Sequence, residues 1–186
     1  FAQDKKSIVI TVPQKQDAAK QNVALGPGGN QYQFKFDSVL HEVSQEDVYE
    51  AAASDVLQSL LEGYNGTIMC YGQTGAGKTF TMSGGRQSFK QRGLIPRVLT
   101  QLFQEVKAQS DTEFKVTVTF LEIYNDQLFD LLDITTQPHE ISVHERAGPA
   151  QGGGAGSGVS VSGLRSVVVG SEAEALQLLF EGETNR

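Results

Sequence analysis

The chain has 186 residues, with 15 Lys plus Arg against 22 Asp plus Glu and a formal charge of -7 at pH 7. This length suffices for about one domain with a hydrophobic core, or for part of a larger one. The negative balance repels polyanions and so argues against general nucleic-acid binding. No stretch approaches the roughly 20 apolar residues that span a bilayer, and the first residues lack a signal-peptide pattern. The single cysteine, Cys70, lies in an apolar run, which is typical of a packing role in a reducing compartment. We therefore expect a soluble intracellular protein with no membrane partner.

The first part of the chain predicts two strands joined by a loop. Residues 7–12 (SIVITV) are rich in β-branched side chains, as strands are. Residues 14–30 are polar and glycine-rich, so we expect a surface loop and favour an insertion without function. Tyr32, Phe34 and Phe36 alternate with polar residues, which predicts a half-buried strand whose aromatic stripe belongs to the core.

A helix, a turn and a buried strand are expected next. Ser44 to Asp47 resemble a capping box, with Asp in place of the usual Glu, and apolar residues follow at helical spacing until Gly63 ends the helix. After a turn, residues 67–71 (TIMCY) form an apolar run that we expect to be a buried strand. The order of helix and strand indicates α/β construction.

The segment after this run matches a phosphate-binding loop, and we use that name for residues 72–79. It satisfies G-x-x-x-x-G-K-[ST] with Gly72, Gln73, Thr74, Gly75, Ala76, Gly77, Lys78 and Thr79. Glycines allow the backbone N–H groups to converge on an anion, the lysine reaches the β- and γ-phosphates, and the threonine hydroxyl ligates Mg²⁺. Residues 78–82 are expected to open a helix whose N-terminus faces the phosphates. A chance glycine-rich turn is the alternative.

Further along, residues 83–92 predict a polar loop, and Pro96 is expected as the first residue of a long amphipathic helix through Val106. Residues 114–124 form the longest strand candidate, with Val116, Val118 and Phe120 on one face, and we expect this strand to be central.

The remaining segments predict short elements around a glycine-rich insertion. Residues 128–132 predict one or two apolar turns, and residues 141–144 a short strand. Residues 148–158 hold five glycines between 152 and 158 and predict a mobile loop. Strand character resumes between 159 and 169, and a second capping box at Ser171 predicts a helix through Phe180.

Few other side chains stand out as candidates for chemistry. His41, His139 and His144 are scattered without metal-ligand spacing, and solvent-facing roles are favoured for all three. Glu122 has two interpretations: a buried acid beside the nucleotide site, or a structural carboxylate with a charged partner. We favour the second.

The flanks of the phosphate-binding loop resemble a known family. Residues 63–68 (GYNGTI) and 71–82 (YGQTGAGKTFTM) are similar to the GYNGTI…YGQTGxGKTxTM signature of kinesin motor domains. Myosins share the fold but carry Glu-Ser where this chain has Gln73-Thr74. Further segments resemble kinesin in the right order, and with them the resemblance covers nearly all of the chain: residues 34–39, 44–49, 92–97, 121–126, 130–132 and 142–145. Residues 127–130 and 178–186 are most similar to the ciliary kinesins of the ninth class.

The resemblance implies an α/β fold of the P-loop NTPase class, with a kinesin-type central mixed sheet and helices on both faces, of which only part is present. It implies ATP or ADP with Mg²⁺ as ligands. Residues 75–79 would wrap the phosphates, Phe80 would stack beside the adenine, and Tyr64 would help line the base pocket. Residues 1–186 would be a partial motor domain, with a small lobe at 141–169 that in kinesins lies against β-tubulin.

Kinesins hydrolyse ATP with an Asn-x-x-Ser-Ser-Arg-Ser-His segment and an Asp-Leu-Ala-Gly segment, and neither occurs in these residues. We therefore expect no catalytic residue within this chain and little hydrolysis by it alone. We expect it to be part of a longer polypeptide, a microtubule motor in the cytoplasm and cytoskeleton or in an axoneme. Such a motor would be a homodimer through other segments.

Two alternatives remain open: a static, kinesin-like scaffold on ciliary microtubules, and an unrelated P-loop kinase or GTPase. The acidic balance and the glycine-filled contact lobe motivate the first. Arg146 and Arg165 flank that glycine run and are few for a surface that faces acidic tubulin.

Overall fold

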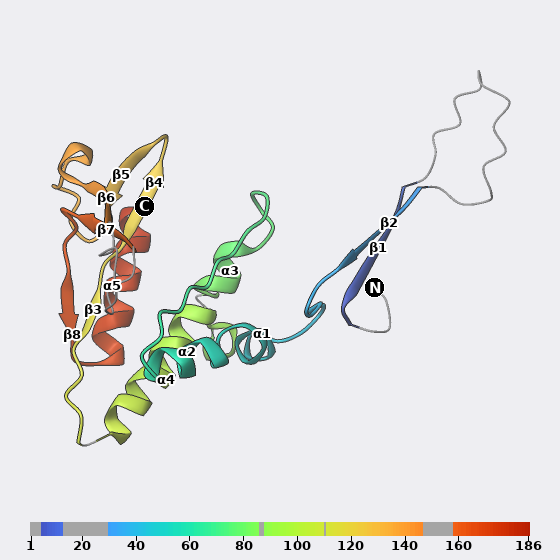
Figure 1. Ribbon diagram of the computed structural model, residues 1–186, viewed down its shortest axis with the longest axis horizontal. Coiled ribbons are helices and arrows are strands. Elements are labelled where there is room, and N and C mark those ends of the chain that lie inside the picture. Colours follow the sequence, from blue (N-terminus) through green and yellow to red (C-terminus); the bar gives the residue numbers. More distant parts are fainter. Residues whose placement is uncertain (1–4, 13–29, 86–87, 110, 147–157) are drawn as a thin grey trace, which may run out of the picture. The chain divides into compact units, whose positions relative to one another are not determined.

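The computed structural model describes residues 5–12, 30–85, 88–109, 111–146 and 158–186. They belong to two compact units, Phe1–Leu94 and Ile95–Arg186. Figure 1 labels the elements along the chain. The loop predicted for 14–30 and the glycine-rich loop predicted for 148–158 lie outside the described residues, apart from the final residue of each, which begins a strand.

Two antiparallel strands open the first unit. Strand β1 (Ser7–Val12) pairs with β2 (Asn30–Lys35), in a register that runs from Ser7 opposite Lys35 to Val12 opposite Asn30. Both strand predictions are confirmed. The assignment of Tyr32, Phe34 and Phe36 to the core is wrong, because each of these side chains is about half exposed. A two-stranded sheet has no second layer of its own, so these aromatic side chains stay accessible.

Two helices follow where the sequence pattern predicts one. Helix α1 (Gln45–Ala52) and helix α2 (Ser54–Leu61) are separated at Ala53, whose φ of -129° is not helical. Tyr49, Ala53 and Leu57 are buried at intervals of four residues on both sides of this break. The apolar spacing therefore continues across the break, which is why the spacing alone predicts one uninterrupted helix.

The capping box at the start of α1 is confirmed. The Asp47 N–H donates to Ser44 Oγ at 3.1 Å, and the Ser44 N–H and hydroxyl donate to Asp47 Oδ2 at 2.9 and 2.7 Å. These hydrogen bonds, first that from the Ser44 side chain and then that from its backbone, hold the pKa of Asp47 below its ordinary value.

The strand predicted for residues 67–71 is wrong. This segment carries no strand assignment, and Met69 and Tyr71 are 84% and 94% exposed. A strand requires hydrogen bonds to a neighbouring chain segment, and none of the described strands pairs with this one. The short helix expected after it is confirmed as α3 (Lys78–Met82), and the 3-10 turn η1 (Phe89–Gln91) lies within the loop predicted for 83–92.

The second unit is built around a small hydrophobic core. Helix α4 (Leu94–Ala108), strand β8 (Val167–Val169) and helix α5 (Glu172–Asn185) supply most of it. Pro96 is the third residue of α4, two positions later than predicted. The buried cluster consists of Phe103, Leu132, Val169, Ala175 and Leu178.

The single strand predicted for 114–124 is instead two strands with different partners. Strand β3 (Val116–Val118) pairs antiparallel with β8, and β4 (Leu121–Tyr124) pairs antiparallel with β5 (Gln127–Asp130). Asn125 and Asp126 have φ of 49° and 58°, as the two central residues of a type I′ hairpin turn require. The chain therefore reverses after Tyr124, and the apolar turns predicted for 128–132 are the returning strand and the loop after it.

A second hairpin and the C-terminal helix agree with prediction more closely. Strand β6 (Ser142–Arg146) pairs antiparallel with β7 (Gly158–Ser162), after the 3-10 turn η2 (Pro138–Glu140). Ser171 Oγ caps α5 by accepting from the Glu174 N–H at 3.3 Å. In a complete capping box the Glu174 carboxylate would accept from the Ser171 N–H. Here it accepts instead from the Gly170 N–H, at 2.8 Å.

The described strands form four two-stranded antiparallel sheets, so the single central sheet expected from the resemblance is not assembled among them. Three of these pairs join strands that follow one another in the chain, and only β3 and β8 are distant in sequence. None of the helices in the described ranges is long and apolar enough to cross a membrane.

Gly182 allows α5 to approach Phe120, which lies between β3 and β4. A Cβ at this buried position would overlap the Phe120 ring, with Cδ1 as the nearest atom. We expect Gly182→Ala to lower the free energy of unfolding by about 1–3 kcal/mol through overpacking, as measured by urea unfolding. Gly170→Ala is the matched control, because its Cβ would meet only Glu174 Oε2 at 3.9 Å. An additional Phe120→Leu substitution should recover part of the loss, and equal stability of the two alanine variants would show that packing at Gly182 is not tight.

A buried carboxylate organises the turn that follows β5. Asp130 is buried; its Oδ1 accepts from the Leu132 and Asp133 N–H groups at 2.8 and 3.2 Å, and its Oδ2 accepts from the Arg165 N–H. The Arg165 guanidinium in turn donates to the Leu132 carbonyl at 2.6 Å.

Asp130→Asn replaces one acceptor by an NH₂ group that faces an N–H donor. We expect it to cost about 1–3 kcal/mol in urea unfolding. Asp126→Asn in the exposed hairpin turn should stay within about 0.5 kcal/mol, since Asn also tolerates positive φ. A cost for Asp130→Asn no larger than that of this control would show that the hydrogen bonds of Asp130 contribute little to stability.

Candidate functional site: the phosphate-binding loop

The glycines of the phosphate-binding loop have the backbone torsions that the motif requires. Gly75 and Gly77 have φ of 82° and 92°, in the left-handed region where a Cβ is strained, and Gly77 is the N-cap residue of α3. A Cβ at either position would meet nothing within 4 Å. The constraint at both positions is therefore torsional, and the surface above them is open to a ligand.

Lys78 is the first residue of α3, and its side chain turns back over the loop. Its Nζ donates to the carbonyls of Gly72 at 2.6 Å and Gln73 at 2.8 Å. An ammonium group has three N–H donors, so these two hydrogen bonds leave one for an anion. The geometry closes the loop and keeps a positive charge beside it.

Thr79 follows in the first turn of α3 and is exposed. The first-turn N–H groups of a helix have no acceptor within the helix, so those of Lys78 and Thr79 suit phosphate oxygens. In the described ranges, no group of three or more His, Cys, Asp or Glu side chains could hold a metal ion. Mg²⁺ in nucleotide sites uses few protein oxygens together with phosphates and water, so a single hydroxyl at Thr79 fits that chemistry.

The two aromatic residues expected around a base are both accessible. Tyr64 lies after α2 and is 67% exposed, and Phe80 lies in α3 and is 49% exposed. Cys70, two residues before the loop, is a free thiol of intermediate exposure. The roles of Tyr64 and Phe80 toward an adenine remain predictions.

One residue near this loop has no role in the sequence interpretation beyond its place in the cap. Gln45 is the first residue of α1 and is only 8% exposed, and its Nε2 donates to the Phe80 carbonyl at 2.6 Å. A glutamine immediately after an N-cap serine is the one signal in the sequence, and the periodicity of α1 reveals neither the burial of Gln45 nor its distant partner.

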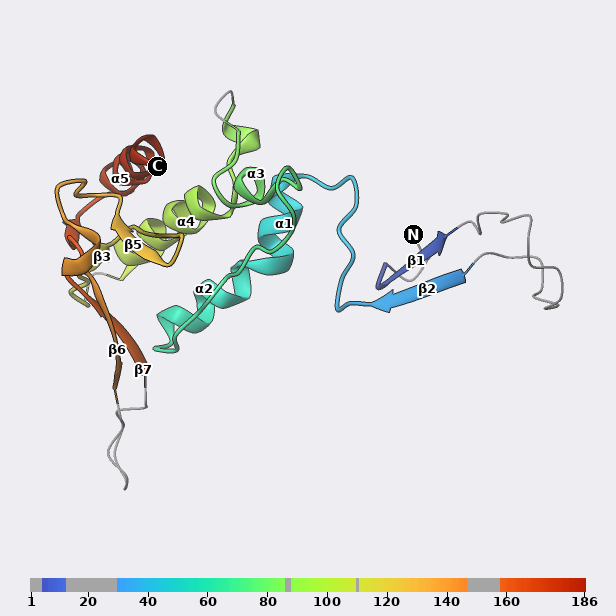
Figure 2. The ribbon, with the colours of Figure 1, turned by 90° about the horizontal axis from the view of Figure 1, so that it is seen from above.

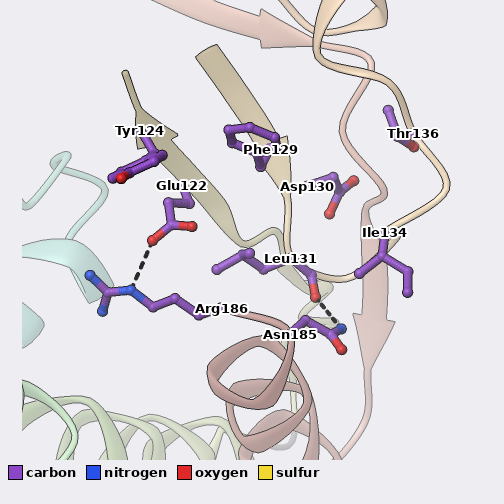
Figure 3. Close-up of a pocket in the computed structure, with 9 residues that line it drawn as sticks. All are labelled: Glu122, Tyr124, Phe129, Asp130, Leu131, Ile134, Thr136, Asn185 and Arg186. Atoms are coloured by element: carbon purple, nitrogen blue, oxygen red, sulfur yellow. Dashed lines mark hydrogen bonds and ion pairs between the residues drawn. The ribbon is translucent and has the colours of Figure 1, made fainter. Parts of the chain in front are cut away.

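A separate pocket of about 270 Å³ lies within the second unit (Figure 3). Arg186 Nε donates to Glu122 Oε1 at 2.8 Å, and Asn185 Nδ2 donates to the Leu131 carbonyl at 2.7 Å. These two bonds fasten the end of α5 to β4 and to the residue after β5. Of the two interpretations of Glu122, the contact supports the structural carboxylate with a charged partner.

Comparisons with known proteins identify the fold and family. Residues 2–186 match the Kinesin motor domain family. A solved structure of a fast kinesin is similar with a TM-score of 0.78 and 30% identity, covering 100% of this chain and 46% of that chain. Kinesin-like protein KIF9 of Homo sapiens is 44% identical over 189 residues, covering 100% of this chain and 22% of that protein. Kinesin-like protein KLP1 of Chlamydomonas reinhardtii is 44% identical over 187 residues, covering 98% and 22%.

These findings first define the class: the chain has the P-loop NTPase fold, in agreement with the α/β class predicted from the sequence. More specifically, the chain belongs to the kinesin motor domain family. Membership also excludes the alternative of an unrelated P-loop kinase or GTPase. The chain spans 22% of the length of both named relatives.

Proposed function

We propose that this chain is the phosphate-binding part of an ATP-dependent microtubule motor. The observation that carries the proposal is the phosphate-binding loop itself, with Gly75 and Gly77 in left-handed torsions and the Lys78 ammonium turned over the loop carbonyls. Membership of the kinesin motor domain family supports ATP or ADP with Mg²⁺ as the ligands and tubulin as the partner.

Within this proposal the residues of the loop have separate tasks. The N–H groups of residues 75–79 bind phosphate oxygens, Lys78 pairs with the β- and γ-phosphates, and Thr79 Oγ ligates Mg²⁺. Phe80 stacks beside the adenine and Tyr64 lines the base pocket. Catalysis of phosphoryl transfer also depends on groups that position the attacking water and stabilise developing charge, and residues 1–186 contain neither hydrolysis segment of the family. The 186 residues alone should therefore bind nucleotide weakly and hydrolyse it poorly.

The microtubule side of the proposal involves the small lobe at 141–169, in which β6 and β7 form a hairpin. Arg165, one of its few basic residues, donates to the Leu132 carbonyl and lies 3.9 Å from Glu181 Oε1. Because the Arg165 guanidinium already has these partners within the unit, less of its positive charge is available to another protein. We therefore expect only a modest contribution of this lobe to the binding of acidic tubulin.

The similarity to KIF9, at 44% identity, supports the narrower resemblance to the ninth kinesin class, and we propose an axonemal location on that basis. The complete protein is proposed to be a homodimer through other segments, without nucleic-acid or membrane partners.

Movement of single molecules of the complete protein along microtubules tests the motor proposal. Processive or diffusive-with-drift movement that requires ATP is the expected result. Static attachment with no directed movement in ATP, in single-molecule and gliding assays alike, would instead favour a scaffold.

A further inference from the structure

Gln45 connects two helices that are far apart in sequence. Its amide group is buried at the start of α1 and donates to the Phe80 carbonyl of α3 at 2.6 Å, across 35 residues of chain. Figure 2 shows α1 beside α3 within the first unit. Phe80 directly follows the two residues that are proposed to contact phosphate and Mg²⁺.

The Phe80 carbonyl needs a partner from outside its own helix. The N–H groups of Ser83 and Gly84 both donate to the Thr79 carbonyl, at 2.8 and 3.3 Å. The next N–H group, that of Gly85, donates to the Gln91 carbonyl at 2.8 Å. The three N–H groups that follow α3 are therefore directed elsewhere, and Gln45 supplies the hydrogen bond. The hydrogen bond is partly buried, and losing its donor would cost free energy, so this contact helps to fix where α3 lies.

The position of Gln45 is itself fixed. It directly follows Ser44, whose capping box orders the first turn of α1, and α1 also packs against η1. Helix α3 has only five residues and is too short to be stable without tertiary contacts. Its orientation therefore depends on neighbours such as α1.

We propose that Gln45 is a positioning residue of the nucleotide site: by holding the Phe80 carbonyl, it fixes α3 and with it Lys78 and Thr79 against α1. The inference rests on the proposed nucleotide binding by the phosphate-binding loop. Such preorganisation increases affinity because the site is ordered before the ligand binds.

The test uses Gln45→Glu in the complete protein, which keeps the size of the side chain but places a second acceptor against the Phe80 carbonyl. The measurement is the dissociation constant of a fluorescent ADP with Mg²⁺, together with the thermal unfolding temperature and the fraction of molecules that bind. We expect about 5- to 30-fold weaker binding with an unchanged binding fraction.

Gln45→Met, which removes the donor without adding an acceptor, should weaken binding in the same direction by a smaller factor. Glu46→Gln, at the next and exposed position, is the matched control and should bind as the wild type does.

A merely structural role would lower the unfolding temperature or the binding fraction and leave the dissociation constant of the folded molecules unchanged. That result would overturn the proposal. If Gln45→Glu does not fold, Gln45→Met decides by the same criterion. Wild-type protein that fails to bind ADP would refute the proposed function itself, and wild-type binding with unchanged affinity in the Gln45 variants would refute only the positioning role.

Discussion

Lys78→Ala in the complete protein should weaken the binding of ADP with Mg²⁺ by about 100-fold or more. The substitution removes the ammonium charge and its one remaining N–H donor to the phosphates, a charge-assisted hydrogen bond worth about 1.5–3 kcal/mol. It also removes the bonds from Nζ to the Gly72 and Gln73 carbonyls that close the loop. Equilibrium titration with a fluorescent ADP measures the effect.

Two further variants make this result specific. Lys107→Ala removes an exposed lysine from the last turn of α4 and should leave the affinity unchanged. Lys78→Arg retains the charge but replaces a compact ammonium by a planar fork, so we expect an intermediate loss. An affinity of Lys78→Ala within twofold of the wild type would exclude Lys78 from the site.

Thr79→Ala should reduce the contribution of Mg²⁺ to nucleotide affinity by roughly tenfold, as the loss of one charge-assisted oxygen contact predicts. The test is a titration of the dissociation constant of ADP against the Mg²⁺ concentration. Thr79→Ser keeps the hydroxyl and should retain the wild-type dependence. Thr79→Val matches the shape without the oxygen and should behave like Thr79→Ala.

The Mg²⁺ dependence separates a ligand role from a packing role. Thr79 is exposed, so the alanine variant should unfold at nearly the wild-type temperature. If Thr79→Val and Thr79→Ser show the same Mg²⁺ dependence as the wild type, the hydroxyl does not ligate the metal.

The local features of the site could be predicted from the sequence because they depend on neighbouring residues. The torsions of Gly75 and Gly77 and the start of α3 at Lys78 follow from the motif, as does the capping box of Ser44 and Asp47. The absence of a strand at 67–71 could not be predicted in the same way. Its apolar run is compatible with a strand, but a strand also needs a partner, and sequence pattern does not specify one.

Two other errors concern local backbone torsions that the hydrophobic pattern does not show. The run 114–124 has continuous strand character, and the reversal after Tyr124 depends on the left-handed torsions of Asn125 and Asp126. The break at Ala53 leaves the buried spacing intact and so has no signal in the hydrophobic period. The hydrogen bond from Gln45 to Phe80 joins residues that no local motif connects. Long-range contacts are the part of the site that only the structure supplies.

ATP turnover by the complete protein, with and without microtubules, in the wild type and in Lys78→Ala, tests the proposed motor activity most directly. We expect turnover that microtubules stimulate in the wild type and that Lys78→Ala abolishes, while both proteins remain folded by circular dichroism. Absence of microtubule-stimulated turnover in the wild type, or equal turnover in Lys78→Ala, would contradict a motor whose phosphates are bound by this loop.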